Sequence, residues 1–453
     1  MRTFNKSIIY AFLSTLLSFS FEAKADEFIR YNASDMTTSG TIVRYYFIDV
    51  DVVCYHHSHP YFMLYRLGTP TSYSLQVDMD TVTDFEIFDG KVFFCGKRNV
   101  SVGGNACFGY FDVTALYSSL SNPVYYFQMP LMEIATALEV GNFANRKHVV
   151  TIGQGTKGEA MVLDAIEEPT YWSMNYCNLC TDTFQLSDIA FTENNVVIAA
   201  SRLIQSTDNI KTLWFGRLWS IKKPTISGSS LFPSNIDYLD FNHAYSTGTK
   251  IKITATEADK FVVAYHAGYY MVGTNPFYVS YYNNLNYINS YIIDEASDSY
   301  FRLGDIAYER HTRNVELLIY GCHSTATGNI YRSLIYEIPD IFSPPSSIPA
   351  HAYDGIYFES LDHTYFDEHM VASGYEQPGS YTTPYYLKYK SGYFDGNCLN
   401  RKENSYRIIH YETKKDNFYF IQTQIPQLPV EETREKKEMN LIYKCYSYDE
   451  KEQ

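Results

Sequence analysis

A phrase that returns along the chain is the feature that most constrains the fold. It occupies residues 82–96 (VTDFEIFDGKVFFCG) and 186–200 (LSDIAFTENNVVIAA), and it returns at 303–308 (LGDIAY) with 315–321 (VELLIYG) behind it. Each copy holds an acidic residue, an alternating strand-like run, a polar turn and a second β-rich run. This order is typical of the first two strands of a β-propeller blade.

The spacing of the copies predicts the number of repeats. Thr136 lies 52 residues after Asp84 and 52 residues before Asp188, in a copy that has lost its acid. The other starts share the strand-like run, and they lie near Ile253, at Asp305, at Asp362 and, in degenerate form, at 41–65 and 406–448. A period of about 40 to 50 residues is the propeller range. We therefore predict an all-β protein, a β-propeller of about seven four-stranded blades with little helix. Six or eight blades stay open, because the last unit either forms a blade or joins the N-terminal strand at 28–31 to close the ring.

This pattern resembles secreted repeat proteins of the β-propeller type over nearly all of the mature sequence. The Gly-His and Trp-Asp signature of WD40 blades is absent, as are the paired glycines of kelch repeats and the Ser-x-Asp-x-Gly-x-x-Trp box of sialidases. Functional residues therefore cannot be assigned to this chain from any characterised propeller family. A parallel β-helix or a pair of β-sandwiches is the alternative fold.

The N-terminus indicates export. Arg2 and Lys6 form a basic region, residues 7–21 are apolar and uncharged, and Ala23-Lys24-Ala25 is a small-x-small cleavage site. We expect residues 1–25 to be a signal peptide and residues 26–453 to be a single propeller domain, secreted or periplasmic. The apolar run is shorter than the ~20 residues of a membrane span, and we expect no membrane insertion. An uncleaved N-terminal anchor is the alternative.

Charge and aromatic content narrow the classes of partner. The net charge of −15 disfavours nucleic acid and anionic membranes, because phosphate binding needs clustered Lys and Arg. The 44 tyrosines suit half-buried strand surfaces, and the alternative is an exposed aromatic platform for sugars or a partner protein. We expect a monomer with a protein or glycan ligand.

The eight cysteines suit an oxidising compartment. Cys95 and Cys107 flank a predicted hairpin loop, so a disulfide between neighbouring strands is a candidate. Cys177 and Cys180 form a C-x-x-C pair, for which a local disulfide is favoured over a redox pair or half of a zinc site, since neither a βαβ context nor a second pair is present. The other four can pair in three ways that sequence does not separate, and they are Cys54, Cys322, Cys398 and Cys445.

Catalytic motifs are absent from the sequence. It has no nucleophile elbow, no His-Glu-x-x-His and no Walker loop, so we assign no catalytic residue, no metal site and no cofactor. His57 and His59 would share one strand face, but no third metal ligand is identifiable.

The recurring acid is the feature that connects the repeat to a function. Innermost strands that begin with Asp84, Asp188, Asp305 and Asp362 would bring four carboxylates around one mouth of the central channel, to bind a cation or sugar hydroxyls. The alternative, which the acid-free copy at Thr136 favours, is that each Asp accepts hydrogen bonds from backbone N–H groups at the start of its own blade.

Two functions follow. The favoured one is an exported, non-catalytic recognition protein that binds a protein or a glycan through one face of the propeller. The alternative is a glycan-active hydrolase or lyase with carboxylates in the central cleft. Recognition is favoured because the sequence carries no catalytic signature.

Overall fold

The structure is a computed structural model, and almost every residue that it describes lies in a β-strand. The described residues are 27–30, 41–47, 51–56, 61–66, 71–98, 106–116, 123–180, 184–205, 212–226, 229–232, 236–243, 250–266, 275–295, 299–310, 312–325, 328–338, 347–363, 369–376, 384–390, 399–403, 405–406, 413–415, 419–426, 429–430 and 434–438. The predicted signal peptide, His57, His59, Cys398 and Cys445 lie outside them. Within the described part, no helix is long and apolar enough to cross a membrane.

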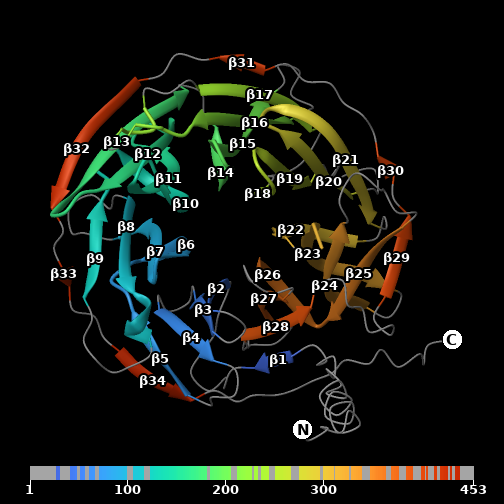
Figure 1. Ribbon diagram of the computed structural model, residues 1–453. Helices are drawn as coiled ribbons and strands as arrows, with labels where there is room; N and C mark the ends of the chain where they lie inside the picture. Colours follow the sequence, from blue (N-terminus) through green and yellow to red (C-terminus); the bar gives the residue numbers. More distant parts are fainter. Residues whose placement is uncertain are drawn as a thin grey trace, which may run out of the picture.

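Antiparallel sheets follow one another along the chain and stand around a ring (Figure 1). Each sheet is named here by its order in the chain, with its innermost strand first. Sheet 1 contains β2 (Thr41–Phe47), β3 (Asp51–His56), β4 (Tyr61–Arg66) and β5 (Thr71–Gln76). Sheet 2 contains β6 (Thr81–Phe88), β7 (Lys91–Lys97), β8 (Ala106–Asp112) and β9 (Val124–Gln128). Sheet 3 contains β10 (Met132–Phe143), β11 (Arg146–Gly155), β12 (Ala160–Glu167) and β13 (Tyr171–Cys180).

The later sheets repeat this order. Sheet 4 contains β14 (Gln185–Phe191), β15 (Asn195–Gln205), β16 (Thr212–Lys222) and β17 (Ile236–His243). Sheet 5 contains β18 (Ile251–Ala255), β19 (Lys260–His266), β20 (Asn275–Asn283) and β21 (Asn286–Glu295). Sheet 6 contains β22 (Ser299–Glu309), β23 (Asn314–Thr325), β24 (Gly328–Ile338) and β25 (Ser347–Asp354). Sheet 7 contains β26 (Ile356–His363), β27 (His369–Glu376), β28 (Pro384–Lys390) and the N-terminal strand β1 (Glu27–Arg30).

The innermost strands close a circle. Each contacts the innermost strand of the next sheet, from β2 through β6, β10, β14, β18 and β22 to β26, and β26 contacts β2. The prediction of an all-β propeller with little helix is confirmed, since the one helix in the described residues is the short 3-10 helix η2 (Val113–Leu116).

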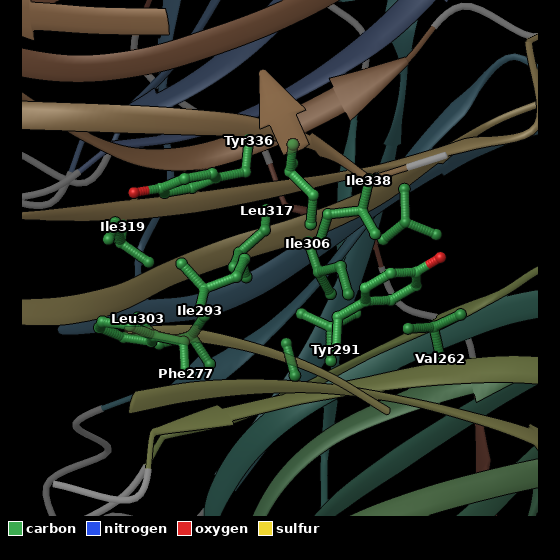
Figure 2. Packing of buried hydrophobic residues seen from close by; sticks show 14 of the residues in the cluster. Val262, Phe277, Tyr291, Ile293, Leu303, Ile306, Leu317, Ile319, Tyr336 and Ile338 are labelled. Carbon is green, nitrogen blue, oxygen red and sulfur yellow. The ribbon is translucent and has the colours of Figure 1, made fainter. Parts of the chain in front are cut away.

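The core lies between neighbouring sheets, because most strands bury both faces. In β7, Val92 and Phe94 face the cluster shared with sheet 1, whereas Phe93 and Cys95 face the cluster shared with sheet 3. Figure 2 shows the cluster between sheets 5 and 6, where Phe277 and Tyr291 meet residues of β22, β23 and β24. Alternation of side chains along a strand places apolar residues on both faces, so the strands read as almost continuous apolar runs.

The predicted strand pair at 82–96 is present, and its turn explains its sequence. β6 and β7 are joined by Asp89 and Gly90 between the paired residues Phe88 and Lys91. Both turn residues have positive φ, 51° and 70°, as a two-residue hairpin turn with right-handed twist requires. Asp-Gly is a preferred sequence for this turn.

The C-terminal segment forms a belt around the outside of the ring (Figure 1). It adds an outer antiparallel strand to six sheets in reverse chain order, starting at sheet 6 and ending at sheet 1. The belt strands are β29 (Leu399–Glu403), β30 (Ser405–Tyr406), β31 (Thr413–Lys415), β32 (Tyr419–Pro426), β33 (Pro429–Val430) and β34 (Arg434–Glu438). The longest pairing joins β32 to β13, from Tyr171 opposite Pro426 to Asn178 opposite Tyr419.

The belt corrects two predictions. Six of the sheets have five strands and one has four, so a uniform four strands per blade was wrong. The unit at 406–448 is not a blade and does not join the N-terminal strand: its described residues belong to the belt, while β1 pairs with β28, Phe28 opposite Leu387. Short strands that pair only with a distant edge carry no repeat pattern of their own.

Removal of the belt should expose the outer edges of six sheets. For a chain that ends after residue 398, we expect faster amide exchange in β13, β25 and β5 and a lower midpoint of thermal unfolding, because their outward N–H groups lose their acceptors. Hydrogen exchange followed by mass spectrometry measures this directly. A chain that ends after residue 438 keeps every belt strand and is the control. Equal exchange in the two truncated chains would contradict a stabilising belt.

Candidate functional site

The recurring acids lie beside a β-bulge in the innermost strands. The pairing shifts by one residue between Val82 and Asp84, between Leu186 and Asp188, and between Leu303 and Asp305. Ala137 and Ser360 follow the bulge of sheets 3 and 7. The sequence phrase therefore marks a structural position, the residue after the bulge, and we refer to it as the bulge position.

At this position the carboxylate binds the next sheet. Asp84 Oδ2 accepts a hydrogen bond of 3.1 Å from the backbone N–H of Leu138. Asp188 Oδ2 accepts one of 2.9 Å from Ile253 N–H, and Asp305 Oδ2 accepts one of 3.1 Å from Leu361 N–H. These donors lie on innermost strands, whose inward edge has no neighbouring strand. Each acid thus caps an edge N–H across a sheet boundary.

Two of the acids also cap their own strand. Asp84 Oδ1 accepts from Phe85 N–H at 3.0 Å, and Asp305 Oδ1 accepts from Ile306 N–H at 3.0 Å. The interpretation that each Asp accepts hydrogen bonds from backbone N–H groups of its own blade therefore holds for Asp84 and Asp305. In addition, all three aspartates accept a hydrogen bond from a backbone N–H group of the following sheet.

Glycine on the second strand accommodates the bulge. A Cβ at Gly96 would lie 2.0 Å from the carbonyl oxygen of Thr81, and one at Gly153 would lie 1.9 Å from that of Ile134. Because the obstructing atoms are backbone, no side-chain movement relieves the contact. This explains the glycine that ends the phrase at 82–96.

Sheet 5 carries a lysine where sheets 2, 4 and 6 carry an acid. Ile253 N–H is the group capped by Asp188, as Leu138 N–H is by Asp84, so Lys252 occupies the position equivalent to the bulge position, although β18 itself has no bulge. Lys252 Nζ lies 3.6 Å from Asp188 Oδ2 and 3.4 Å from Asp305 Oδ1. One ammonium therefore bridges the acids of the preceding and following sheets.

Burial dominates the electrostatics of this bridge. The side chains of Asp188, Lys252 and Asp305 are only 12%, 17% and 11% exposed. Burial raises the pKa of Asp188 to about 6, Asp305 adds to the rise, and Lys252 and the Ile253 N–H oppose it. Salt screens such a pair far less than it screens a surface pair.

Asp362 does not belong to this set. Ser360 follows the bulge of β26, so Asp362 lies two residues beyond the bulge position, where its side chain is 24% exposed and 4.0 Å from His363 Nδ1. The sequence brought it into the predicted ring because sheet 7 has a serine at the bulge position and the next acid along the chain is two residues later. In sheet 3 the position is Ala137, not Thr136.

The predicted disulfides are wrong for the four candidate cysteines, none of which forms a disulfide. Cys95 pairs with Phe108, whereas Cys107 pairs with Gly96, so the two are offset by one residue. They point to opposite faces of sheet 2, into different core clusters. Cys177 and Cys180 lie in the same strand, β13, and Cys322 forms no disulfide with a described residue either. Burial raises the pKa of Cys177 to about 12, which makes its thiolate rare at neutral pH.

A second cluster lies between sheets 6 and 7, and we name it the tyrosine patch: Arg302, Tyr320, Tyr331, Tyr357 and Glu359. Arg302 and Tyr320 are directly opposite each other on β22 and β23. The Tyr357 ring centroid lies 5.4 Å from that of Tyr320 and 5.7 Å from that of Tyr331. The three tyrosines and Glu359 are half-buried, and Arg302 is exposed.

The patch is polar as well as aromatic. The Tyr320 hydroxyl hydrogen bonds with the Glu359 carboxylate. Burial and the Glu359 charge raise the pKa of Tyr320 to about 12, and the Arg302 charge opposes the rise. Burial likewise raises the pKa of Tyr357, again against Arg302. The arrangement offers flat apolar rings, a cation and a carboxylate within one area.

Sequence reasoning missed Lys252 and the tyrosine patch for different reasons. An alignment of the copy near Ile253 with the earlier phrase would have placed Lys252 opposite the acids. The patch had no such signal, since Tyr320 and Tyr357 come from different sheets in a chain rich in tyrosine. Within the described residues, no group of three or more His, Cys, Asp or Glu side chains is placed to hold a metal ion.

The cap at Asp305 is open to a direct stability test. Asp305→Ala leaves the Ile306 and Leu361 N–H groups without their acceptor, so we expect a loss of about 1–3 kcal/mol in the free energy of unfolding for each group. Asp305→Asn keeps one acceptor oxygen and should lose less. Denaturant unfolding measures both, with Asp362→Ala as the matched control. An equal loss at Asp362 would show that the cap is not what stabilises the ring.

The raised pKa of Asp188 predicts a pH dependence of stability. Because the folded pKa of about 6 exceeds the unfolded value near ~4, the folded state binds the proton more tightly. Relative to Asp188→Asn, the wild type should be most stable below pH ~4 and lose that advantage as pH rises through about 6. A rise of two pKa units corresponds to a difference in the free energy of unfolding of at most about 3 kcal/mol. Urea midpoints measured for both proteins from pH 4 to pH 7 give the difference, and parallel profiles would contradict the prediction.

No protein-family model matches the chain, and no curated protein matches it in sequence.

Proposed function

We propose that the protein is an exported recognition protein that binds a protein or glycan ligand through one face of its propeller. Export rests on the leader at residues 1–25, with Asp26 as the first mature residue. The observation that carries the binding role is the tyrosine patch, in which three half-buried rings lie beside an exposed Arg302. Tyrosine and arginine are the side chains enriched where proteins recognise partners.

The closed ring supports recognition by holding the patch rigidly. Tyr320 and Tyr357 belong to neighbouring sheets that share a buried cluster including Leu318, Ile335 and Phe358. Rings fixed by such packing lose little conformational entropy when a ligand binds. The surrounding hydroxyls and the Glu359 carboxylate add directional hydrogen bonds, which suits a glycan.

Recognition is also favoured by the use of the acids on the innermost strands. Asp188 and Asp305 are occupied by backbone N–H groups and by Lys252. A glycosidase needs two carboxylates that reach the substrate. Because Asp188 and Asp305 bind groups of neighbouring sheets, their main role is structural.

One observation keeps the alternative of a glycan-active hydrolase or lyase. The pKa of Asp188, about 6, is in the range that a general acid uses at neutral pH, and a second acid, Asp305, is nearby. In that reading Asp188 would protonate the leaving oxygen of a glycosidic bond.

A glycan array probed with the mature protein separates these functions. Recognition predicts binding that survives Asp188→Asn, with the bound glycans unchanged after long incubation. Product sugars that disappear in Asp188→Asn would favour the hydrolase or lyase. Tyr357→Ala should weaken binding about 5- to 50-fold, the worth of one aromatic contact, because its ring meets both other tyrosines. Unchanged binding by this variant would remove the patch from the ligand site.

A further inference from the structure

In sheets 2 to 7, one residue near the start of the innermost strand occupies an equivalent position in the strand pairing. These residues lie three positions before the bulge position, or two positions in sheet 5, which has no bulge. They are Thr81, Ile134, Gln185, Arg302 and Tyr357 in sheets 2, 3, 4, 6 and 7, and Lys250 directly before β18 in sheet 5. Tyr357 is half-buried and the other five are exposed. The series is uncharged in sheets 2 to 4 and cationic in sheets 5 and 6, so one sector of the inner circle differs from the rest.

Arg302 is the group in this sector that is available to a ligand. It makes no hydrogen bond or ion pair with any residue in the described part of the chain, although its charge acts on the hydroxyls of Tyr320 and Tyr357. A guanidinium presents donors in a fixed fork that matches a carboxylate in two parallel hydrogen bonds. An exposed arginine beside aromatic rings is therefore suited to an anion that also has a flat apolar surface.

Lys250 adds a second cation from the adjacent sheet. Its ammonium donates a 2.6 Å hydrogen bond to the carbonyl oxygen of Gly304, two residues from Arg302. An ammonium has three donors, so this bond leaves donors for a ligand. This hydrogen bond to the backbone holds the Lys250 ammonium next to β22.

Glu359 and the tyrosines determine the rest of the ligand. The Glu359 carboxylate accepts a hydrogen bond from the Tyr320 hydroxyl. A carboxylate has about four acceptor sites, so Glu359 can also accept hydrogen bonds from hydroxyl groups of a ligand. A ligand that brings a carboxylate to Arg302, hydroxyls to Glu359 and a ring face to tyrosine is an acidic sugar. A carboxylate-rich peptide would meet the cations but would supply no hydroxyls to Glu359.

From these groups we infer that the tyrosine patch, together with Lys250, binds a carboxylate-bearing saccharide, of the uronic acid type. The inference rests on the proposed recognition function and names its ligand class. Arg302 binds the carboxylate, Lys250 adds charge, and the tyrosine rings pack against the sugar ring.

The test uses calorimetric titration of the mature protein with three probes: a uronic acid tetramer, a neutral hexose tetramer and a short polyglutamate peptide. We expect the uronic acid tetramer alone to bind, more weakly as salt rises. Arg302→Gln should weaken binding about 10- to 100-fold, the worth of a charge-assisted pair, and Lys250→Gln should weaken it less. Arg310→Gln is the matched control, an exposed arginine in the turn directly after β22.

The outcomes separate this inference from the proposed function. Equal binding of the neutral tetramer, or equal effects of Arg302→Gln and Arg310→Gln, overturns the acidic sugar and leaves glycan recognition standing. Tighter binding of polyglutamate overturns it in favour of a protein ligand. If neither tetramer nor any glycan on the array binds, glycan recognition and the inference fail together. A thermal melt of each variant confirms that the ring is intact.

Discussion

Unpaired strand edges are the constraint on which this structure depends. Every sheet in a ring of separate sheets has an inner and an outer edge, and each edge carries backbone groups that need a partner. At the inner edge, Asp84, Asp188 and Asp305 supply carboxylate acceptors to the next sheet. At the outer edge, the belt supplies a whole strand to six sheets. Unpaired backbone groups are therefore satisfied by side chains at the inner edge of a sheet and by main-chain pairing at the outer edge.

The sequence predicted what is local and repeated. The strand pairs that we predicted at 82–96 and 186–200 are present. They were predictable because alternating apolar residues, a polar turn and an acid at the bulge position recur together. The aspartates were found for the same reason, although their role is to join sheets. Asp362 was included wrongly, since sheet 7 has a serine at the bulge position and the next acid along the chain is two residues later.

Contacts between distant segments were beyond the sequence. Whether Cys95 and Cys107 face each other depends on a register offset of one residue, which no spacing reveals. The belt strands are as short as Pro429–Val430, and such segments gain their structure only from the edge they join. The tyrosine patch forms because β22, β23, β24 and β26 meet, and that meeting is a property of the closed ring.

The reverse course of the belt has a consequence for synthesis. The inner strands of sheet 1 begin at residue 41, yet its outer strand, Arg434–Glu438, is made more than 350 residues after its partner β5. The nascent chain therefore carries six incomplete sheets until residues 399–438 have been made. A nonsense mutation near residue 398 would leave all six without their outer strand, so loss of one-eighth of the chain would affect nearly the whole perimeter.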